Sequence, residues 1–237
     1  MNALVGTSGF SYDEWTGAFY PEKLKPADRL GYYAERFRSV EVNNTFYRMP
    51  KGEVLARWKD QTPEGFVFVL KASQRITHKE RLKESADSVG YFFENAAALG
   101  GKLGPTLFQL PPNMKKDAAR LASFLDVLGD RRAAFEFRHP SWMDEEVYAL
   151  LRSHGAALCA ADTDDSGEEG APLVPTAGWG YLRLRRAEYS PEDLGAWAGR
   201  LHGQGWSQAY VFFKHEVKGP ALAHAFEEAC RACRAHS

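Results

Sequence analysis

The chain has 237 residues, of which 44% are hydrophobic and 13% aromatic, enough apolar material for a sizeable buried core. Lys and Arg total 30 against 31 Asp and Glu, which argues against attraction of the whole surface to nucleic acid or acidic membranes. No run approaches the ~20 apolar residues of a membrane helix, the first residues do not resemble a secretory signal, and 3 cysteines do not make a disulfide framework. We therefore expect a cytoplasmic protein without membrane contact.

Short β-rich runs alternate with helical patterns along the chain, and turn signals separate them. In chain order, the pattern predicts strand Leu4–Ser8, helix Ala27–Phe37, strand Val40–Tyr47, helix Glu53–Asp60, strand Phe66–Ala72, helix Ser85–Leu99, strand Thr106–Leu110, helix Asp117–Leu128, strand Ala133–Arg138, helix Asp144–Ser153, strand Ala157–Asp162, strand Gly180–Arg185, helix Pro191–His202, strand Ala209–Lys214 and helix Pro220–Arg234.

This alternation is typical of parallel strands joined by crossover helices. The predicted strands close naturally into an α/β fold of the (β/α)8 TIM-barrel type, a single domain over residues 1–237 that is irregular at the sixth helix. A doubly wound open sheet is the alternative, but no Gly-x-Gly-x-x-Gly follows the first predicted strand.

Two long connections interrupt the repeat. Residues Gly9–Pro26 carry many aromatic side chains, which predicts a segment packed as a lid over the barrel. Residues Thr163–Trp179 hold Gly, Pro and acidic residues where the sixth helix is expected, which predicts a mobile segment.

Several predicted strands place polar side chains on one face and apolar side chains on the other, because successive side chains alternate. The polar face carries Glu41, Asn43 and Thr45 on the second strand, Glu136 and Arg138 on the fifth, and Tyr181, Arg183 and Arg185 on the seventh. The apolar faces suit the outer helices. We therefore expect the polar groups to point into the barrel.

Further polar residues lie at or just past the carboxyl ends of predicted strands, where TIM-barrel enzymes carry their active sites. They are Lys71, Thr77, His78, Gln109, His139, Trp142, Asp162, Lys214 and His215. A purely structural interpretation is an internal ion-pair layer, in which Glu136 meets Arg138 and Glu41 neutralises Lys71.

The predicted function is an enzyme that acts on a small anionic, polyhydroxylated ligand, such as a sugar phosphate or sugar acid. Glu136, Glu41 and His139 are the candidate proton-transfer groups, since carboxylates and imidazoles are the usual acids and bases. We expect three kinds of ligand-binding group: cations that hold phosphate or carboxylate, aromatic side chains that cover the sugar, and polar groups that bind it. The candidates are Lys71, Arg138, Arg183, Arg185, Lys214, Asn43, Tyr12, Trp15, Tyr47, Gln109, Trp142 and His78.

Two other functions stay open. A metal-dependent sugar isomerase or endonuclease-like barrel would use Glu136, Asp162, His215 and Glu216 as ligands of a divalent metal, although the neighbouring cations oppose a metal ion. A non-catalytic module for nucleic acid or protein would combine the same cations with aromatic side chains, but a narrow barrel mouth suits a small ligand better. No cofactor is predicted for the favoured function.

These residues resemble the signature of the YecE-like family, the domain of unknown function numbered seventy-two. The matching motifs are Gly6-Thr7-Ser8-Gly9-Phe10-Ser11-Tyr12, Trp15, Glu41-Val42-Asn43-Asn44-Thr45-Phe46-Tyr47, Phe108-Gln109-Leu110-Pro111-Pro112 and Glu136-Phe137-Arg138-His139. The resemblance implies a TIM barrel related to sugar isomerases and no particular reaction. This chain departs from the family pattern at Phe10, at Arg185-Arg186 and at Lys214-His215-Glu216, and the last two changes add positive charge near the predicted mouth.

Overall fold

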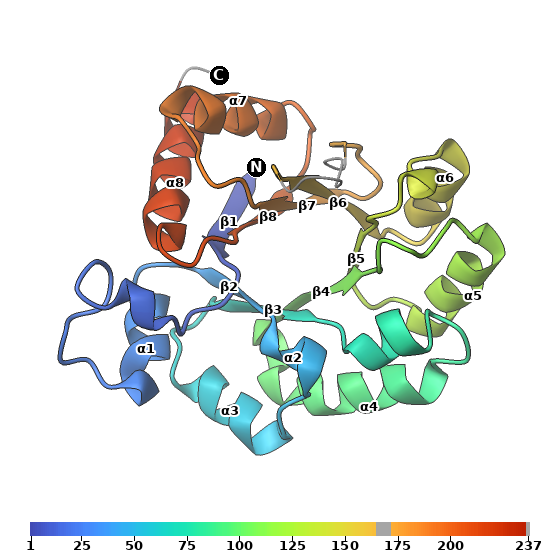
Figure 1. Ribbon diagram of the computed structural model, residues 1–237, viewed down its shortest axis with the longest axis horizontal. Helices are drawn as coiled ribbons and strands as arrows, with labels where there is room; N and C mark the ends of the chain where they lie inside the picture. The colour runs from blue at the N-terminus through green and yellow to red at the C-terminus, as the bar shows by residue number, and fades with distance from the viewer. Residues whose placement is uncertain (165–171, 236–237) are drawn as a thin grey trace.

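The computed structural model describes residues 1–164 and 172–235, whose strands form one sheet with the order β1-β8-β7-β6-β5-β4-β3-β2. Every strand pairs in parallel with its neighbour. A bridge between Ser8 and Glu41, with the Gly9 amide donating to the Glu41 carbonyl at 2.7 Å, joins the two ends of the sheet. The predicted (β/α)8 barrel is thereby confirmed, with helices around the ring of strands (Figure 1).

Apart from a short helix at Asn44–Tyr47, the strands and helices follow the predicted order. The strands are β1 Asn2–Thr7, β2 Ser39–Val42, β3 Val67–Lys71, β4 Leu103–Gln109, β5 Ala133–Glu136, β6 Ala157–Asp162, β7 Trp179–Leu184 and β8 Gln208–Phe213. The α-helices are α1 Arg29–Ala34, α2 Asn44–Tyr47, α3 Gly52–Asp60, α4 Ala86–Ala96, α5 Ala118–Leu128, α6 Glu145–Ser153, α7 Pro191–His202 and α8 Gly219–Ala235.

Alternation along the strands divides the apolar core into two parts. Inside the barrel, residues such as Leu4, Val69, Leu107 and Tyr181 form one buried cluster. The opposite faces pack under the helices, where Leu182 belongs to the second and larger cluster. Apolar packing thus fills the amino-terminal part of the barrel, and polar side chains take the same inward positions toward the carboxyl ends of the strands.

Glycine permits two close contacts in this wall. A Cβ at Gly6 would lie 2.1 Å from the Ser39 carbonyl oxygen, so only glycine lets β1 approach β2 where the sheet closes. A Cβ at Gly180 would lie 2.1 Å from the Trp206 ring, which packs against β7.

The second predicted strand was too long. The strand ends at Val42, because Asn43 takes a helical backbone conformation and α2 begins at Asn44. Thr45 is therefore not on the inward face of a strand; its hydroxyl donates to the carbonyls of Val42 at 3.0 Å and Lys71 at 2.7 Å. These side-chain bonds compete with strand pairing and turn the chain into the short helix.

Between β6 and β7 no helix occurs among residues 163–164 and 172–178, in agreement with the irregularity predicted at the sixth helix. The mobility predicted for Thr163–Trp179 stays a prediction, and residues 165–171 of this stretch lie outside the described part of the chain. Within the described ranges no helix is long and apolar enough to cross a membrane.

Candidate functional site

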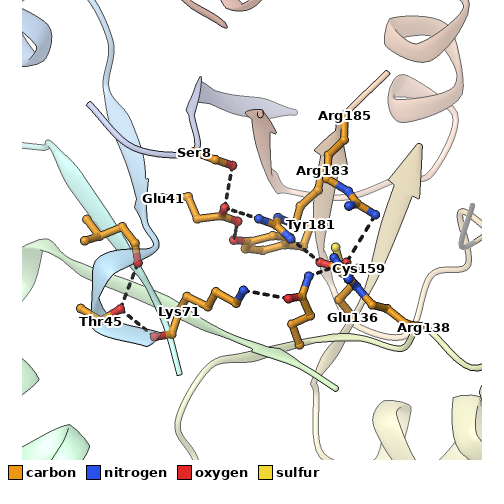
Figure 2. Close-up of polar contacts among 12 residues, drawn as sticks. Ser8, Glu41, Thr45, Lys71, Glu136, Arg138, Cys159, Tyr181, Arg183 and Arg185 are labelled. Carbon is orange, nitrogen blue, oxygen red and sulfur yellow. Dashed lines mark hydrogen bonds and ion pairs between the residues drawn. The ribbon is translucent and has the colours of Figure 1, made fainter. Parts of the chain in front are cut away.

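An arginine and two glutamates form the centre of the polar mouth. Arg183 on β7 donates from Nη2 to Glu41 Oε1 at 2.9 Å and from Nη1 to Glu136 Oε2 at 2.6 Å. All three side chains are at most 2% exposed. Figure 2 shows Arg183 lying between the two carboxylates, which come from β2 and β5. The guanidinium thus ties together three separate strands across the barrel.

Glu41 is surrounded by donors. Besides Arg183, its carboxylate accepts hydrogen bonds from the Ser8 hydroxyl and the Tyr181 hydroxyl, each at 2.6 Å (Figure 2). Burial raises the pKa of Glu41, but Arg183 and these hydrogen bonds outweigh burial and hold the pKa below its usual value. The structure therefore favours a counter-ion role for Glu41 over the proton-transfer role predicted from sequence.

Glu136 is also a buried carboxylate with a lowered pKa, and it has more cations around it than Glu41 has. It accepts from Gln109 Nε2 at 2.8 Å, and Arg138 Nε and Arg185 Nη2 lie 3.4 and 3.7 Å from its Oε1. Burial raises its pKa, but Arg183, Arg185 and Arg138 together hold it well below the usual range. The predicted meeting of Glu136 and Arg138 is confirmed, and Glu136 stays ionised at any physiological pH.

Lys71 does not have the partner predicted for it. Its Nζ donates to Gln109 Oε1 at 2.7 Å and lies 4.2 Å from the centre of the Phe46 ring, whereas Glu41 pairs with Arg183. Burial and the nearby Arg183 lower the pKa of Lys71 to about 8. The ammonium group of Lys71 is thus held by a neutral amide.

Lys214 and His78 also lie near the cations of the mouth. The pKa of Lys214 is lowered by burial and by Arg183, Arg185 and Arg138, although its side chain reaches the surface. The pKa of His78 is lowered by burial, Lys71 and Arg138. Burial is the main cause of the lowered pKa values of these groups, and the neighbouring cations lower them further.

Two tryptophans predicted to cover a ligand lie elsewhere. Trp15 is 1% exposed and packs with Tyr12, Phe19 and Tyr20 at centroid distances of 4.8, 5.8 and 5.9 Å. The aromatic loop is therefore mainly part of the core and not a lid. Trp142 is fully buried, stacks on Phe137 and donates from Nε1 to the Met114 carbonyl at 2.7 Å.

Other predicted residues are spread around the rim. Tyr12 donates from its hydroxyl to the Ser8 carbonyl at 2.7 Å, and it lines a cavity of about 130 Å³ together with Asn43. Tyr47 is 73% exposed on α2 and covers nothing in the centre. The His139 ring accepts a hydrogen bond from the Ser141 amide at 3.1 Å and so caps the short helical turn Pro140–Trp142.

The metal ligands considered from sequence do not assemble. Asp162 accepts from Trp197 Nε1 at 2.9 Å, on the outer helix α7, and Glu136 is enclosed by guanidinium groups. Among the residues that the structure describes, no group of three or more His, Cys, Asp or Glu is arranged to hold a metal ion.

Two cavities have linings rich in charged side chains. One of about 520 Å³ opens beside β7 and β8, lined by Arg185, Arg186, Lys214, His215, Asp164 and Glu216 among others. A larger one of about 680 Å³ lies outside the mouth, lined by residues that include Arg48, Lys51, Arg75 and Tyr91. Sequence reasoning missed this second groove, because its residues share no strand face and come from separate segments.

Fold and site together define a TIM-barrel protein whose mouth holds a buried Glu–Arg–Glu cluster surrounded by further cations. The family profile described as "Protein of unknown function DUF72" matches residues 4–236, and the chain belongs to that family.

The relatives agree with this assignment. UPF0759 protein YunF of Bacillus subtilis is 29% identical over 224 residues, covering 89% of this chain and 78% of that protein. UPF0759 protein YecE of Escherichia coli is 36% identical over 127 residues, covering 52% of this chain and 47% of that protein. The crystal structure of a DUF72 family protein from Thermotoga maritima is 29% identical, with a TM-score of 0.85 and coverage of 98% of this chain and 100% of that one. D-psicose 3-epimerase, solved in the presence of D-fructose, shares the fold at 12% identity and a TM-score of 0.53, covering 100% of this chain and 98% of that one.

Proposed function

We propose that the barrel mouth binds a small anionic, polyhydroxylated molecule, such as a sugar phosphate or a sugar acid, and acts on it as an enzyme. The observation that carries this proposal is the surplus of positive charge. Glu41 and Glu136 face Lys71, Arg138, Arg183, Arg185 and Lys214, whose mutual repulsion contributes to the lowered pKa values of both lysines. A bound anion would relieve this repulsion, so its binding is favoured by the site as built.

The cavity beside β7 and β8 supplies the space. Its volume of about 520 Å³ falls in the usual range for small-molecule sites, and Arg185 and Lys214 line it. Asp164 and Glu216 are also in its lining, so the wall offers acceptors for hydroxyl groups as well as cations for an acidic group. This mixture suits a sugar acid or a sugar phosphate better than an inorganic anion.

Asn43 adds a second polar position. Its side-chain oxygen is buried and has no hydrogen-bond partner among the residues that the structure describes. A ligand hydroxyl could donate to this oxygen from the small cavity that Asn43 and Tyr12 line. D-psicose 3-epimerase, which was solved in the presence of D-fructose, shows that a protein of this fold can act on a sugar; its likeness to this chain is one of fold.

The test compares charged with uncharged ligands by thermal shift and isothermal titration. Ribose 5-phosphate should raise the melting temperature, ribose should not, and added salt should weaken the effect. The double variant Arg185→Met/Lys214→Met should lose the response, whereas Lys115→Met, a change at an exposed lysine, should retain it. Equal stabilisation by ribose, or an unchanged response in the double variant, would show that this is not an anion site.

Arg183 is unsuitable for that test. It is buried between two carboxylates, and Arg183→Met would leave both of them without their shared counter-ion. Loss of binding in such a variant would report on folding rather than on ligand contact.

A further inference from the structure

The side chain of Lys71 is placed unlike the other cations of the mouth. It extends from the end of β3, is half-buried, and has a neutral amide oxygen as its hydrogen-bond acceptor, Gln109 Oε1 at 2.7 Å. Within the part of the chain that the structure describes, no carboxylate lies in ion-pairing distance of Nζ. Figure 2 shows the Lys71 amine directed toward the centre of the mouth.

Gln109 holds this amine in a fixed direction. Its Nε2 donates to Glu136 Oε1 at 2.8 Å, which leaves Oε1 as the atom that faces Lys71. Glu136 is itself fixed by Arg183 at 2.6 Å. The hydrogen-bonded row Lys71–Gln109–Glu136–Arg183 therefore positions the amine without neutralising its charge.

Charged groups of both signs face Lys71 from the surrounding strands. Arg183 on β7 and Arg138 beyond β5 oppose its protonation, while Glu136 on β5 and Glu41 on β2 favour it. His78, beyond β3, faces Lys71 as well, since Lys71 lowers the pKa of that imidazole. Burial and the arginines prevail, and the pKa of Lys71 is about 8. At pH 7 about one Lys71 in ten is then a free amine, against roughly one in several thousand for an ordinary lysine.

We propose that Lys71 is a nucleophile that forms a Schiff base with the carbonyl group of an anionic ligand. This inference rests on the proposed function, because the cations around Arg185 and Lys214 would hold the acidic group of the same molecule. The ligand class narrows accordingly to aldehydes and ketones that carry a phosphate or carboxylate, such as the open-chain form of a sugar phosphate.

The chemistry balances without a further reactant. The neutral amine attacks the carbonyl carbon, so that a C–N bond forms while the C=O π electrons move to oxygen, which takes up a proton. Nitrogen then loses one proton. The C–O bond breaks as the C=N bond forms, and the departing hydroxyl takes up a second proton to become water while nitrogen gives up its remaining proton. One amine and one carbonyl thus give one imine and one water, as expected for a lysine with a lowered pKa.

The experiment uses pyridoxal 5′-phosphate as the probe, since it carries an aldehyde and a phosphate. The full chain is incubated with the probe, reduced with sodium borohydride, and mapped by peptide mass spectrometry. Lys71 should be modified roughly tenfold or more faster at pH 7 than the exposed Lys25 and Lys115, because of its larger free-amine fraction. Its rate should rise with a midpoint near pH 8, matching the pKa of about 8.

Variants separate the amine from its charge. Lys71→Arg keeps the positive charge and should lose the modified peptide, whereas Lys115→Arg should leave modification of Lys71 unchanged. Modification of Lys71 no faster than that of Lys115 would overturn the proposal, as would a midpoint close to pH 10.

A parallel series distinguishes this inference from the anion site. Pyridoxal lacks the phosphate, and inorganic phosphate competes for the anion site without reacting. If pyridoxal modifies Lys71 as fast as its phosphate ester and inorganic phosphate gives no protection, the nucleophile stands and the anion site is refuted. If inorganic phosphate binds and stabilises the protein while Lys71 shows no selectivity, the anion site stands and the nucleophile is refuted.

Discussion

Arg183 Nη1 and Glu136 Oε2 lie 2.6 Å apart, joining two strands that are not neighbours in the sheet. Arg183 makes its second ion pair with Glu41, which is 142 residues away in sequence. Both pairs are buried, so their Coulomb attraction is offset by a large cost of desolvation. Removing one partner is therefore the informative perturbation.

Glu136→Gln keeps the shape of the side chain and removes its charge. We expect a loss of about 3–5 kcal/mol in the free energy of unfolding, the usual range for breaking a buried ion pair. Urea unfolding at pH 7 measures it. Phosphate should restore part of the stability by replacing the lost negative charge. Glu35→Gln, at an exposed glutamate, is the control and should unfold like the wild type. A Glu136→Gln protein as stable as the wild type would contradict the assigned counter-ion role.

Acid should destabilise the protein through the same carboxylates. The folded pKa values of Glu41 and Glu136 are both below those of the unfolded chain. Their contribution is therefore complete above the unfolded value of about 4.3 and is lost as the pH falls below it. The melting temperature should decline more steeply between about pH 5 and pH 3 in the wild type than in Glu136→Gln, as calorimetry over that range can show.

Lys71 differs from the two glutamates, because its charged form is disfavoured in the folded state while theirs is favoured. Its folded pKa of about 8 lies below the unfolded value, so its protonated form is unfavourable in the folded state. Lys71→Met should therefore stabilise the unliganded protein at pH 7 by about 1–2 kcal/mol, after allowance for the lost bond to Gln109. The stabilisation by Lys71→Met should be complete below pH 8. It should disappear as the pH rises toward about 10.5, where the unfolded lysine also loses its proton. A Lys71→Met protein that is less stable than the wild type at pH 7 would contradict the expected stabilisation.

Trp142 tests a residue that the sequence placed in the binding site and the structure places in the core. Trp142→Phe removes the indole N–H that donates to the Met114 carbonyl and leaves a small cavity. We expect a loss of about 1–3 kcal/mol in stability with an unchanged response to ribose 5-phosphate. A weakened response at full stability would restore Trp142 to the site.

The sequence predicts the barrel well because strand and helix periodicity are local properties. β6 and α7 occupy the residues expected for them, and the alternating faces of β5 and β7 are correctly oriented. Which ions pair is not a local property. It depends on how the strands are staggered around the barrel, and this brings Arg183, rather than Lys71, to Glu41.

The errors have a common physical origin. Trp15 and Trp142 follow strands where a rim residue is expected, but large apolar side chains gain more free energy from burial than from covering a ligand. At Thr45, side-chain hydrogen bonding outweighed a β-rich run of residues. Cavities assembled from separate loops leave no periodic signal at all.

The sharing of one guanidinium by two carboxylates also constrains how this protein can change over generations. A single substitution at Glu41, Glu136 or Arg183 leaves at least one buried charge with too little compensation, so each one-step path passes through a weakened protein. Replacement of the three by apolar residues of similar volume removes the unpaired charge among them, although Arg138 and Arg185 then lose the carboxylate that they approach. Positions 41, 136 and 183 should therefore vary together among descendants or stay fixed together, and a lineage that has lost the arginine should have lost both glutamates.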